Sequence, residues 1–138
     1  MANQNTILQA FTAVNKLKGF ISAGQLAVMR AYCHGEEGQF FIDKLCDLSS
    51  RIDTMPATYE TEGGEDPIAF LHYFKGRADF YITEKDCDED GEGQIQAFGL
   101  ADIGYGAELG YISIQELIEC GVEIDLHFEP KRLSEIRK

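Results

Sequence analysis

The stretch "PIAFLHYFKGRADFYITE" at residues 67–84 decides the fold, because here the helical period of the preceding residues changes to a period of two. Its first part places Ile68, Phe70, His72 and Phe74 on one side of an extended chain and Ala69, Leu71 and Tyr73 on the other. Such alternation is typical of a strand. "KGR" at 75–77 predicts a tight turn, and "ADFYITE" at 78–84 predicts the returning strand. The sequence therefore predicts a β-hairpin.

Further strands follow on the C-terminal side of this hairpin. A third is predicted around 95–103, and "GYISIQELIECG" at 110–121 predicts a short strand followed by a short helix. Ser113 and Glu116 have the spacing of a capping box at the start of that helix, and Gly121 ends it. "VEIDLHFE" at 122–129 alternates apolar and polar residues and predicts a last strand with one buried face.

Residues 1–56 have a helical pattern instead. Apolar residues recur at helical spacing from Ile7 to Lys18, and Ser22 and Gln25 form a second capping-box pattern. A third apolar stripe runs from Phe41 to Met55 and stops at Pro56. We therefore expect about three helices.

These elements predict an α+β fold. We expect an N-terminal helical layer packed on the apolar face of an antiparallel sheet of about four strands, with one short helix inserted. The helical segment is assigned to residues 1–56 and the acidic, β-rich part to 57–138, together forming one compact unit. A linker is expected near "ATYETEGGED" at 57–66.

The net charge of −12 is distributed unevenly. Residues 1–56 hold five basic and five acidic residues, whereas residues 57–138 hold seven basic and nineteen acidic ones. Such a surplus repels nucleic acid and membrane headgroups and attracts basic partners. We therefore expect no direct nucleic-acid binding and no membrane association.

The cysteines and the N-terminus bear on the cellular compartment. The sequence has no apolar run of membrane-spanning length and no signal-peptide pattern at its start, so a cytoplasmic protein is expected. Cys33, Cys46, Cys87 and Cys120 are widely spaced and favour reduced thiols over disulfides or a zinc site. No cofactor and no metal are expected.

The acidic stretch "DCDEDG" at 86–91 matches the opening of an EF-hand calcium loop. Ala97 stands where that loop requires its closing Glu, and the flanking segments have strand patterns where an EF-hand has helices. An acidic hairpin loop explains the stretch better. Weak calcium binding stays as an alternative.

Two other patterns could carry chemistry. "GYGAELG" at 104–110 is close to a dinucleotide-binding loop, but Glu108 would repel a pyrophosphate, so a tight turn is favoured. A small active site could instead gather His72, His127, Glu108 and Tyr105. No standard nucleophile, metalloprotease or phosphate-loop motif supports that enzymatic alternative.

Four phrases in the second half are distinctive: "DPIAFLHYF" at 66–74, "FYITEKD" at 80–86, "QAFGLADIGYGAELGYISIQEL" at 96–117 and "EIDLHFEPKRLSEI" at 123–136. Over roughly residues 56–136 they resemble a family of small domains of unassigned function found on plasmids, integrative elements and phages. The resemblance implies an accessory gene of a mobile element. It brings no established catalytic residue to this chain.

Charge and context together predict a non-catalytic, acidic protein-binding module. Its expected target is a basic, nucleic-acid-binding host protein or nucleoprotein complex of the defence machinery, inhibited through mimicry of nucleic acid, as anti-CRISPR or antirestriction proteins would do. The alternative is an acidic surface that serves solubility alone. The residues predicted to contact the partner are Asp86, Asp88, Glu89, Asp90, Glu92, Glu123, Asp125 and Glu129.

Overall fold

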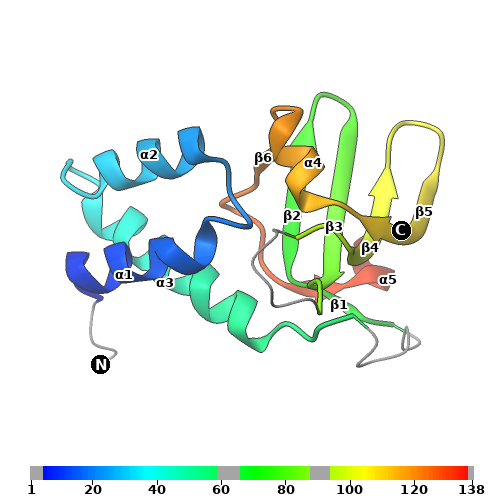
Figure 1. The fold of residues 1–138 in the computed structure, drawn as a ribbon, viewed down its shortest axis with the longest axis horizontal. Helices are drawn as coiled ribbons and strands as arrows, with labels where there is room; N and C mark the ends of the chain where they lie inside the picture. Colours follow the sequence, from blue (N-terminus) through cyan, green and yellow to red (C-terminus); the bar gives the residue numbers. More distant parts are fainter. Residues whose placement is uncertain (1–4, 59–65, 88–93, 137–138) are drawn as a thin grey trace. The chain divides into compact units, whose positions relative to one another are not determined.

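The computed structural model describes residues 5–58, 66–87 and 94–136. The chain divides into two compact units, Met1–Thr54 and Met55–Lys138, and each is described by itself. The first unit is helical and the second contains the strands (Figure 1). Within the described ranges, no helix has the length and apolarity needed to cross a membrane.

The helical unit contains the three predicted helices, α1 (Ile7–Leu17), α2 (Ala23–Tyr32) and α3 (Gly38–Thr54). Thr6 caps α1 in a full capping box with Gln9, which the sequence patterns had not indicated. Ser22 caps α2 as predicted, since its hydroxyl accepts a hydrogen bond from the Gln25 amide. Buried residues of all three helices, among them Leu17, Met29 and Leu45, form the interior of this unit.

The second unit is built on an antiparallel sheet with the strand order β5-β4-β3-β2-β6. Its strands are β2 (Leu71–Lys75), β3 (Ala78–Glu84), β4 (Ala97–Asp102), β5 (Ala107–Ile112) and β6 (Glu123–Ile124). The predicted hairpin is confirmed, because β2 pairs with β3 and the turn between them has a positive φ of 58° at Gly76. The flanks of the acidic stretch are likewise the strands β3 and β4, not EF-hand helices.

Two predicted strands differ from the structure. The strand expected over 67–74 breaks at Phe70, where β1 (Ile68–Ala69) leaves the main sheet and pairs with β7 (Lys131–Arg132). The strand expected over 122–129 ends after Ile124, because the Asp125 carboxylate accepts the His127 amide and turns the chain. The prediction of a long last strand was wrong because a local side-chain hydrogen bond replaced a ladder bond.

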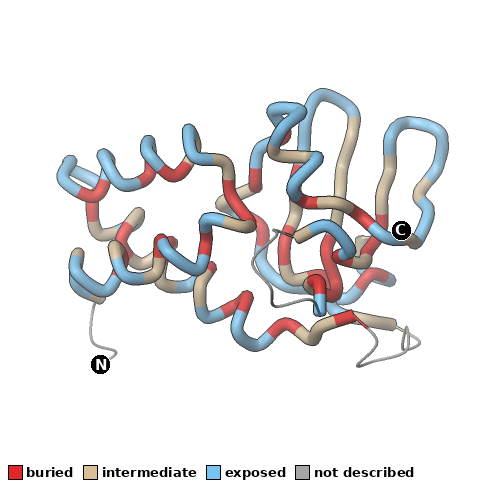
Figure 2. The backbone as a smooth tube through the Cα atoms, viewed as in Figure 1, coloured by how far each residue is buried: buried red, intermediate tan, exposed pale blue. Residues whose placement is uncertain are grey.

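Each face of the sheet is covered in part. One face carries Leu71, Tyr73 and Ile82, and α4 (Ile114–Glu119), capped by Ser113 as predicted, lies over it. The other face carries His72, Tyr81 and Leu100, and its part around Leu100 and Tyr81 is covered by the C-terminal segment, which ends in α5 (Leu133–Ile136). Leu133 is buried and Ile136 packs beside it, so the C-terminal segment is anchored to this face by apolar contacts. The tips of the β2–β3 and β4–β5 hairpins are exposed (Figure 2).

Candidate functional site: a carboxylate-bracketed histidine

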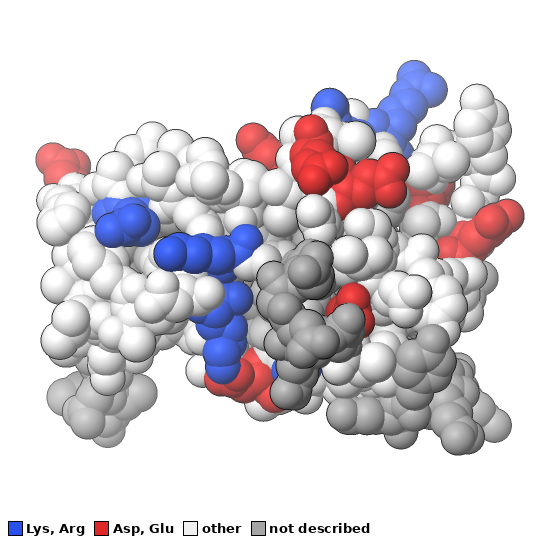
Figure 3. Space-filling model, in the orientation of Figure 1, with Lys and Arg blue, Asp and Glu red and all other residues white. Residues whose placement is uncertain are grey.

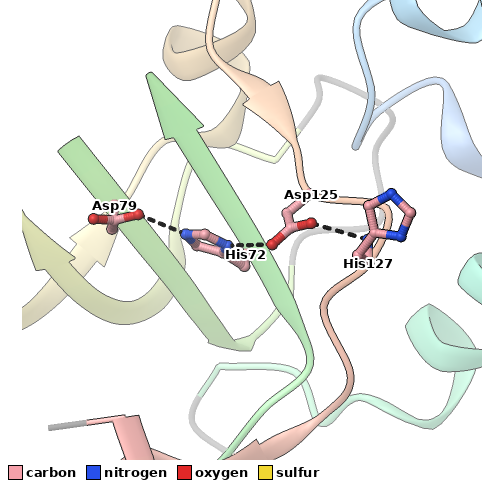
Figure 4. Close-up of polar contacts among 4 residues, drawn as sticks. All are labelled: His72, Asp79, Asp125 and His127. Atoms are coloured by element: carbon pink, nitrogen blue, oxygen red, sulfur yellow. Dashed lines mark hydrogen bonds and ion pairs between the residues drawn. The ribbon is translucent and has the colours of Figure 1, made fainter. Parts of the chain in front are cut away.

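The imidazole of His72 lies between two carboxylates (Figure 4). Its Nδ1 is 2.8 Å from Oδ2 of Asp125, and its Nε2 is 2.8 Å from Oδ1 of Asp79. Ionised carboxylates only accept hydrogen bonds, so both contacts are made at once when both ring nitrogens carry a proton. The charged ring then links β3, which carries Asp79, to the segment after β6, which carries Asp125.

The sheet register explains why these residues meet. His72 is directly opposite Tyr81 in the β2–β3 pair, and their rings stack with centroids 4.6 Å apart and planes 8° apart. Asp79 lies two residues before Tyr81 and so shares its face. Asp125 reaches the same ring from the other side, because its amide donates to the His72 carbonyl at 2.8 Å.

Opposing influences act on the pKa of Asp125. Burial raises it, but the hydrogen bonds from the His72 ring and the His127 amide, together with the positive charges of the two imidazoles, lower it by more. The net pKa lies below the ordinary value for an aspartate. The folded protein therefore favours the ionised form of this carboxyl group.

Further carboxylates share this side of the sheet. Asp102 is opposite Asp79 across the β3–β4 pair, and Glu123 is opposite Phe74, a residue on the same face as His72. We call Asp79, Asp102, Glu123 and Asp125 the carboxylate face. The carboxylate face also affects the hydroxyl group of Tyr81. The pKa of Tyr81 is raised first by burial and then by the charges of Asp79, Asp102 and Asp125.

The predicted contact residues have different places in the structure. Glu123 and Asp125 lie on the carboxylate face, and Glu129 is exposed next to Phe128, whose ring packs against those of His72 and Tyr81. Asp86 is 8% exposed, and its Oδ2 accepts hydrogen bonds from the Ile95 and Gln96 amides. Four others lie outside the described residues: Asp88, Glu89, Asp90 and Glu92.

Two residues of the carboxylate face, Asp79 and Asp102, were not singled out from the sequence. The available signal was the alternation in β3, which puts Asp79 on the same face as Tyr81. Asp102 had no comparable local signal, because only the pairing of β3 with β4 brings it opposite Asp79. Its Oδ1 accepts the Gly104 amide at 2.9 Å and so helps to form the β4–β5 turn.

The residues of the enzymatic alternative do not form a single site. His72 and His127 both contact Asp125, the second through its backbone amide. Glu108 pairs with Ala101, a position on the opposite face of the sheet from Leu100 and His72. Tyr105 lies in the β4–β5 turn with 93% of its surface exposed. The structure thus brings together the two histidines and leaves the other two residues apart from them.

A separate cleft with a volume of about 400 Å³ lies between α4 and the sheet face opposite to the carboxylate face. Phe80 and Leu117 line it, together with Lys75, Glu116 and Cys120 at its polar margin. The Lys75 ammonium donates to the Cys120 carbonyl at 2.6 Å. This cation is therefore used to tie the end of α4 to β2.

Neither a disulfide nor a metal-binding cluster occurs in the described parts of the chain. All four cysteines are free thiols, of which Cys33 is buried and Cys87 and Cys120 are exposed. Across residues 5–58, 66–87 and 94–136, no group of three or more His, Cys, Asp or Glu residues is arranged to hold a metal ion.

Acidic residues also occur away from the carboxylate face. Between Lys85 and Lys131 the sequence contains no lysine or arginine. On the side of the sheet unit seen in Figure 3, acidic side chains lie around α4 and β5, and basic ones near the tip of the β2–β3 hairpin. Among the described residues, no lysine or arginine forms an ion pair with the carboxylate face, whose ionic contacts come from His72.

Fold and site together define a small α+β protein whose antiparallel sheet carries a histidine clamped by aspartates. Comparison with protein families gives a match over residues 45–136 to a family described as "Protein of unknown function (DUF2958)". The chain belongs to this family, in agreement with the resemblance to a family of unassigned function. No curated protein and no solved structure matches the chain.

Proposed function

We propose that this protein is a non-catalytic binding module whose sheet unit presents the carboxylate face to a basic partner. The observation that carries the proposal is the convergence of Asp79, Asp102 and Asp125 around Tyr81, with Glu123 beside them. Among the described residues, Asp79 and Asp125 form their ion pairs with the imidazole of His72 and with no lysine or arginine. A cationic surface that docks there would replace solvent around carboxylates that share one face.

The contacts and burial of His72 favour a binding function over a catalytic one. Both of its ring nitrogens are engaged by carboxylates, and its side chain is 13% exposed. A general base needs a ring nitrogen within reach of a substrate proton. The arrangement of Asp79, His72 and Asp125 instead fixes the position of two of the carboxylates.

The partner that we propose is a nucleic-acid-binding protein of a host, and the protein itself an accessory factor of a plasmid or phage that inhibits it. Neighbouring strands are about 4.8 Å apart. Carboxylates on adjacent strands therefore approach the spacing of one charge per about 3.4 Å along a DNA strand. The resemblance of the four sequence phrases to a family found on mobile elements supports this context.

Affinity capture that uses the wild-type protein and its variants as bait tests the proposal. The variant Asp102→Asn/Glu123→Lys removes three negative charge equivalents from the carboxylate face and keeps an oxygen acceptor for the Gly104 amide. The control Glu36→Lys/Glu37→Gln makes the same charge change at exposed positions of the helical unit. We expect wild type and control to capture the same basic protein at low salt and the first variant to lose it.

Salt dependence completes this test. Recovery of the partner should fall steeply between about 50 mM and about 200 mM NaCl, because screening weakens contacts between exposed charges. Equal capture by the folded Asp102→Asn/Glu123→Lys variant would contradict the proposal. Capture that persists at high salt would also contradict it.

A further inference from the structure

We propose that β5 is a docking edge, to which an extended segment of alternating basic and apolar residues adds as a further strand. This inference rests on the proposed function and specifies the part of the partner that binds. β5 is the last strand of the order β5-β4-β3-β2-β6, and no described strand pairs with its outer side. Alternate N–H and C=O groups of β5 are directed away from β4 and can accept such a strand.

The sequence of β5 contains no lysine and no proline, and its only charged residue is Glu108. Edge strands commonly carry lysine, proline or a β-bulge, or are very short. β5 reads "AELGYI" and pairs with β4 without a register shift from Ala107 to Ile112. The opposite edge of the sheet, β6, spans only Glu123–Ile124. A long regular edge is therefore present on one side of the sheet alone.

Apolar side chains on β5 are exposed on the same face of the sheet. Leu109 is 50% exposed and Tyr111 is 57% exposed. Tyr111 is supported from within, because its ring packs edge-on against Phe98 with centroids 5.6 Å apart. Peptides that add to a sheet edge gain affinity from the backbone and specificity from alternate side chains of this kind.

Gly110 leaves open space on the Glu108 side of β5. A Cβ atom at this residue would meet nothing within 4 Å, and its φ is not in the left-handed region. Its ladder partner Gly99 is different, because a Cβ there would lie 1.9 Å from the Tyr81 carbonyl oxygen. Glycine at Gly110 thus has no internal packing requirement among the described residues.

The charge around β5 selects the occupant. Glu108 lies on the sheet face that α4 covers, where Glu116 follows, and Asp102, opposite Ala107, lies on the face of Leu109 and Tyr111. A second copy of this chain also has a net charge of −12, so the two copies repel each other. A segment with lysine or arginine on the side of Glu108 and apolar residues on the side of Leu109 complements both faces.

A defined probe separates strand addition from charge attraction alone. The probe is the capped peptide (Lys-Val)4, and the control is the same peptide N-methylated at its four central residues, which keeps the charge and removes the central donors. We expect binding of the probe to slow hydrogen exchange at amides between Ala107 and Ile112, measured by NMR. N-methylation should weaken binding by at least about tenfold.

Variants of the intact chain provide a second measurement. Leu109→Lys/Tyr111→Lys should weaken probe binding by about tenfold or more, because lysine on an edge opposes pairing. The control Ile68→Lys/Ile95→Lys adds the same charge at exposed apolar positions outside β5 and should change binding by less than about threefold, the effect of added charge alone.

Two outcomes would overturn the inference. If both peptides bind equally and perturb the carboxylate face without protecting the β5 amides, the edge is not the docking site, although the proposed acidic binding function stands. If neither peptide binds, strand addition is excluded as well. The proposed function is then judged separately, by the capture of a basic protein with the carboxylate-face variants.

Discussion

At the scale of single residues, the contacts of Asp125 should give the protein a specific acid sensitivity. The pKa of this carboxyl group is lowered in the folded state, so its ionised form stabilises the fold at pH values above the unfolded pKa of about 3.9. That contribution is lost as pH falls through the folded pKa. The change Asp125→Asn keeps the shape of the side chain and removes the charge.

We expect Asp125→Asn to lower the free energy of unfolding at pH 7 by roughly 1–2 kcal/mol, the scale of a hydrogen bond to a charged group. The difference from wild type should hold between pH 7 and about pH 5 and be smaller at about pH 3, because pH 3 lies below the unfolded pKa of about 3.9. Urea unfolding at these three pH values measures it. A difference that grows on acidification would show that the clamp with His72 does not favour the ionised carboxyl group.

At the scale of elements, the paired glycines of β4 and β5, Gly99 and Gly110, differ in the space that an added Cβ atom would have. Gly99 approaches β3 closely beside the register shift between Ile82 and Glu84, and a Cβ there would clash with the Tyr81 carbonyl. Gly110 has open space. We therefore expect Gly99→Ala to destabilise the protein by about 3 kcal/mol or more, because backbone must shift to relieve the overlap.

The matched change Gly110→Ala should alter the free energy of unfolding by less than about 0.5 kcal/mol, or raise it slightly, since alanine restricts the unfolded chain. Thermal and urea unfolding of the two variants give the comparison. Similar losses of unfolding free energy at both positions would show that Gly99 is not packed more closely than Gly110.

At the scale of the whole molecule, the surplus of carboxylates should make stability depend on salt. Raising NaCl from about 10 mM to about 150 mM shortens the Debye length from about 30 Å to about 8 Å. At pH 7 we expect the free energy of unfolding to rise by roughly 1 kcal/mol, because repulsion among like charges is screened.

The exposed pair Glu123→Gln/Glu129→Gln serves as the control for this salt effect, because it lowers the repulsion and should reduce the dependence. Urea midpoints measured over the salt series decide the outcome. A midpoint that falls with added salt would mean that attractive ion pairs, not repulsion, dominate the electrostatic energy.

The sequence by itself determined the local features of this protein. The change of period at residues 67–84 predicted the hairpin, and the caps at Ser22 and Ser113 predicted where α2 and α4 begin. These signals are local because helical and extended periodicity and capping involve residues a few positions apart. The family resemblance in the second half likewise came from short phrases of sequence.

Only the tertiary structure decided which carboxylates share a site. Asp79 and Asp125 are far apart in the chain and meet at His72 because strand order and register place them there. The same is true of Asp86, which resembled a surface ligand in the sequence and is buried against the Ile95 and Gln96 amides. Contacts of this kind depend on long-range pairing and desolvation, which no local spacing specifies.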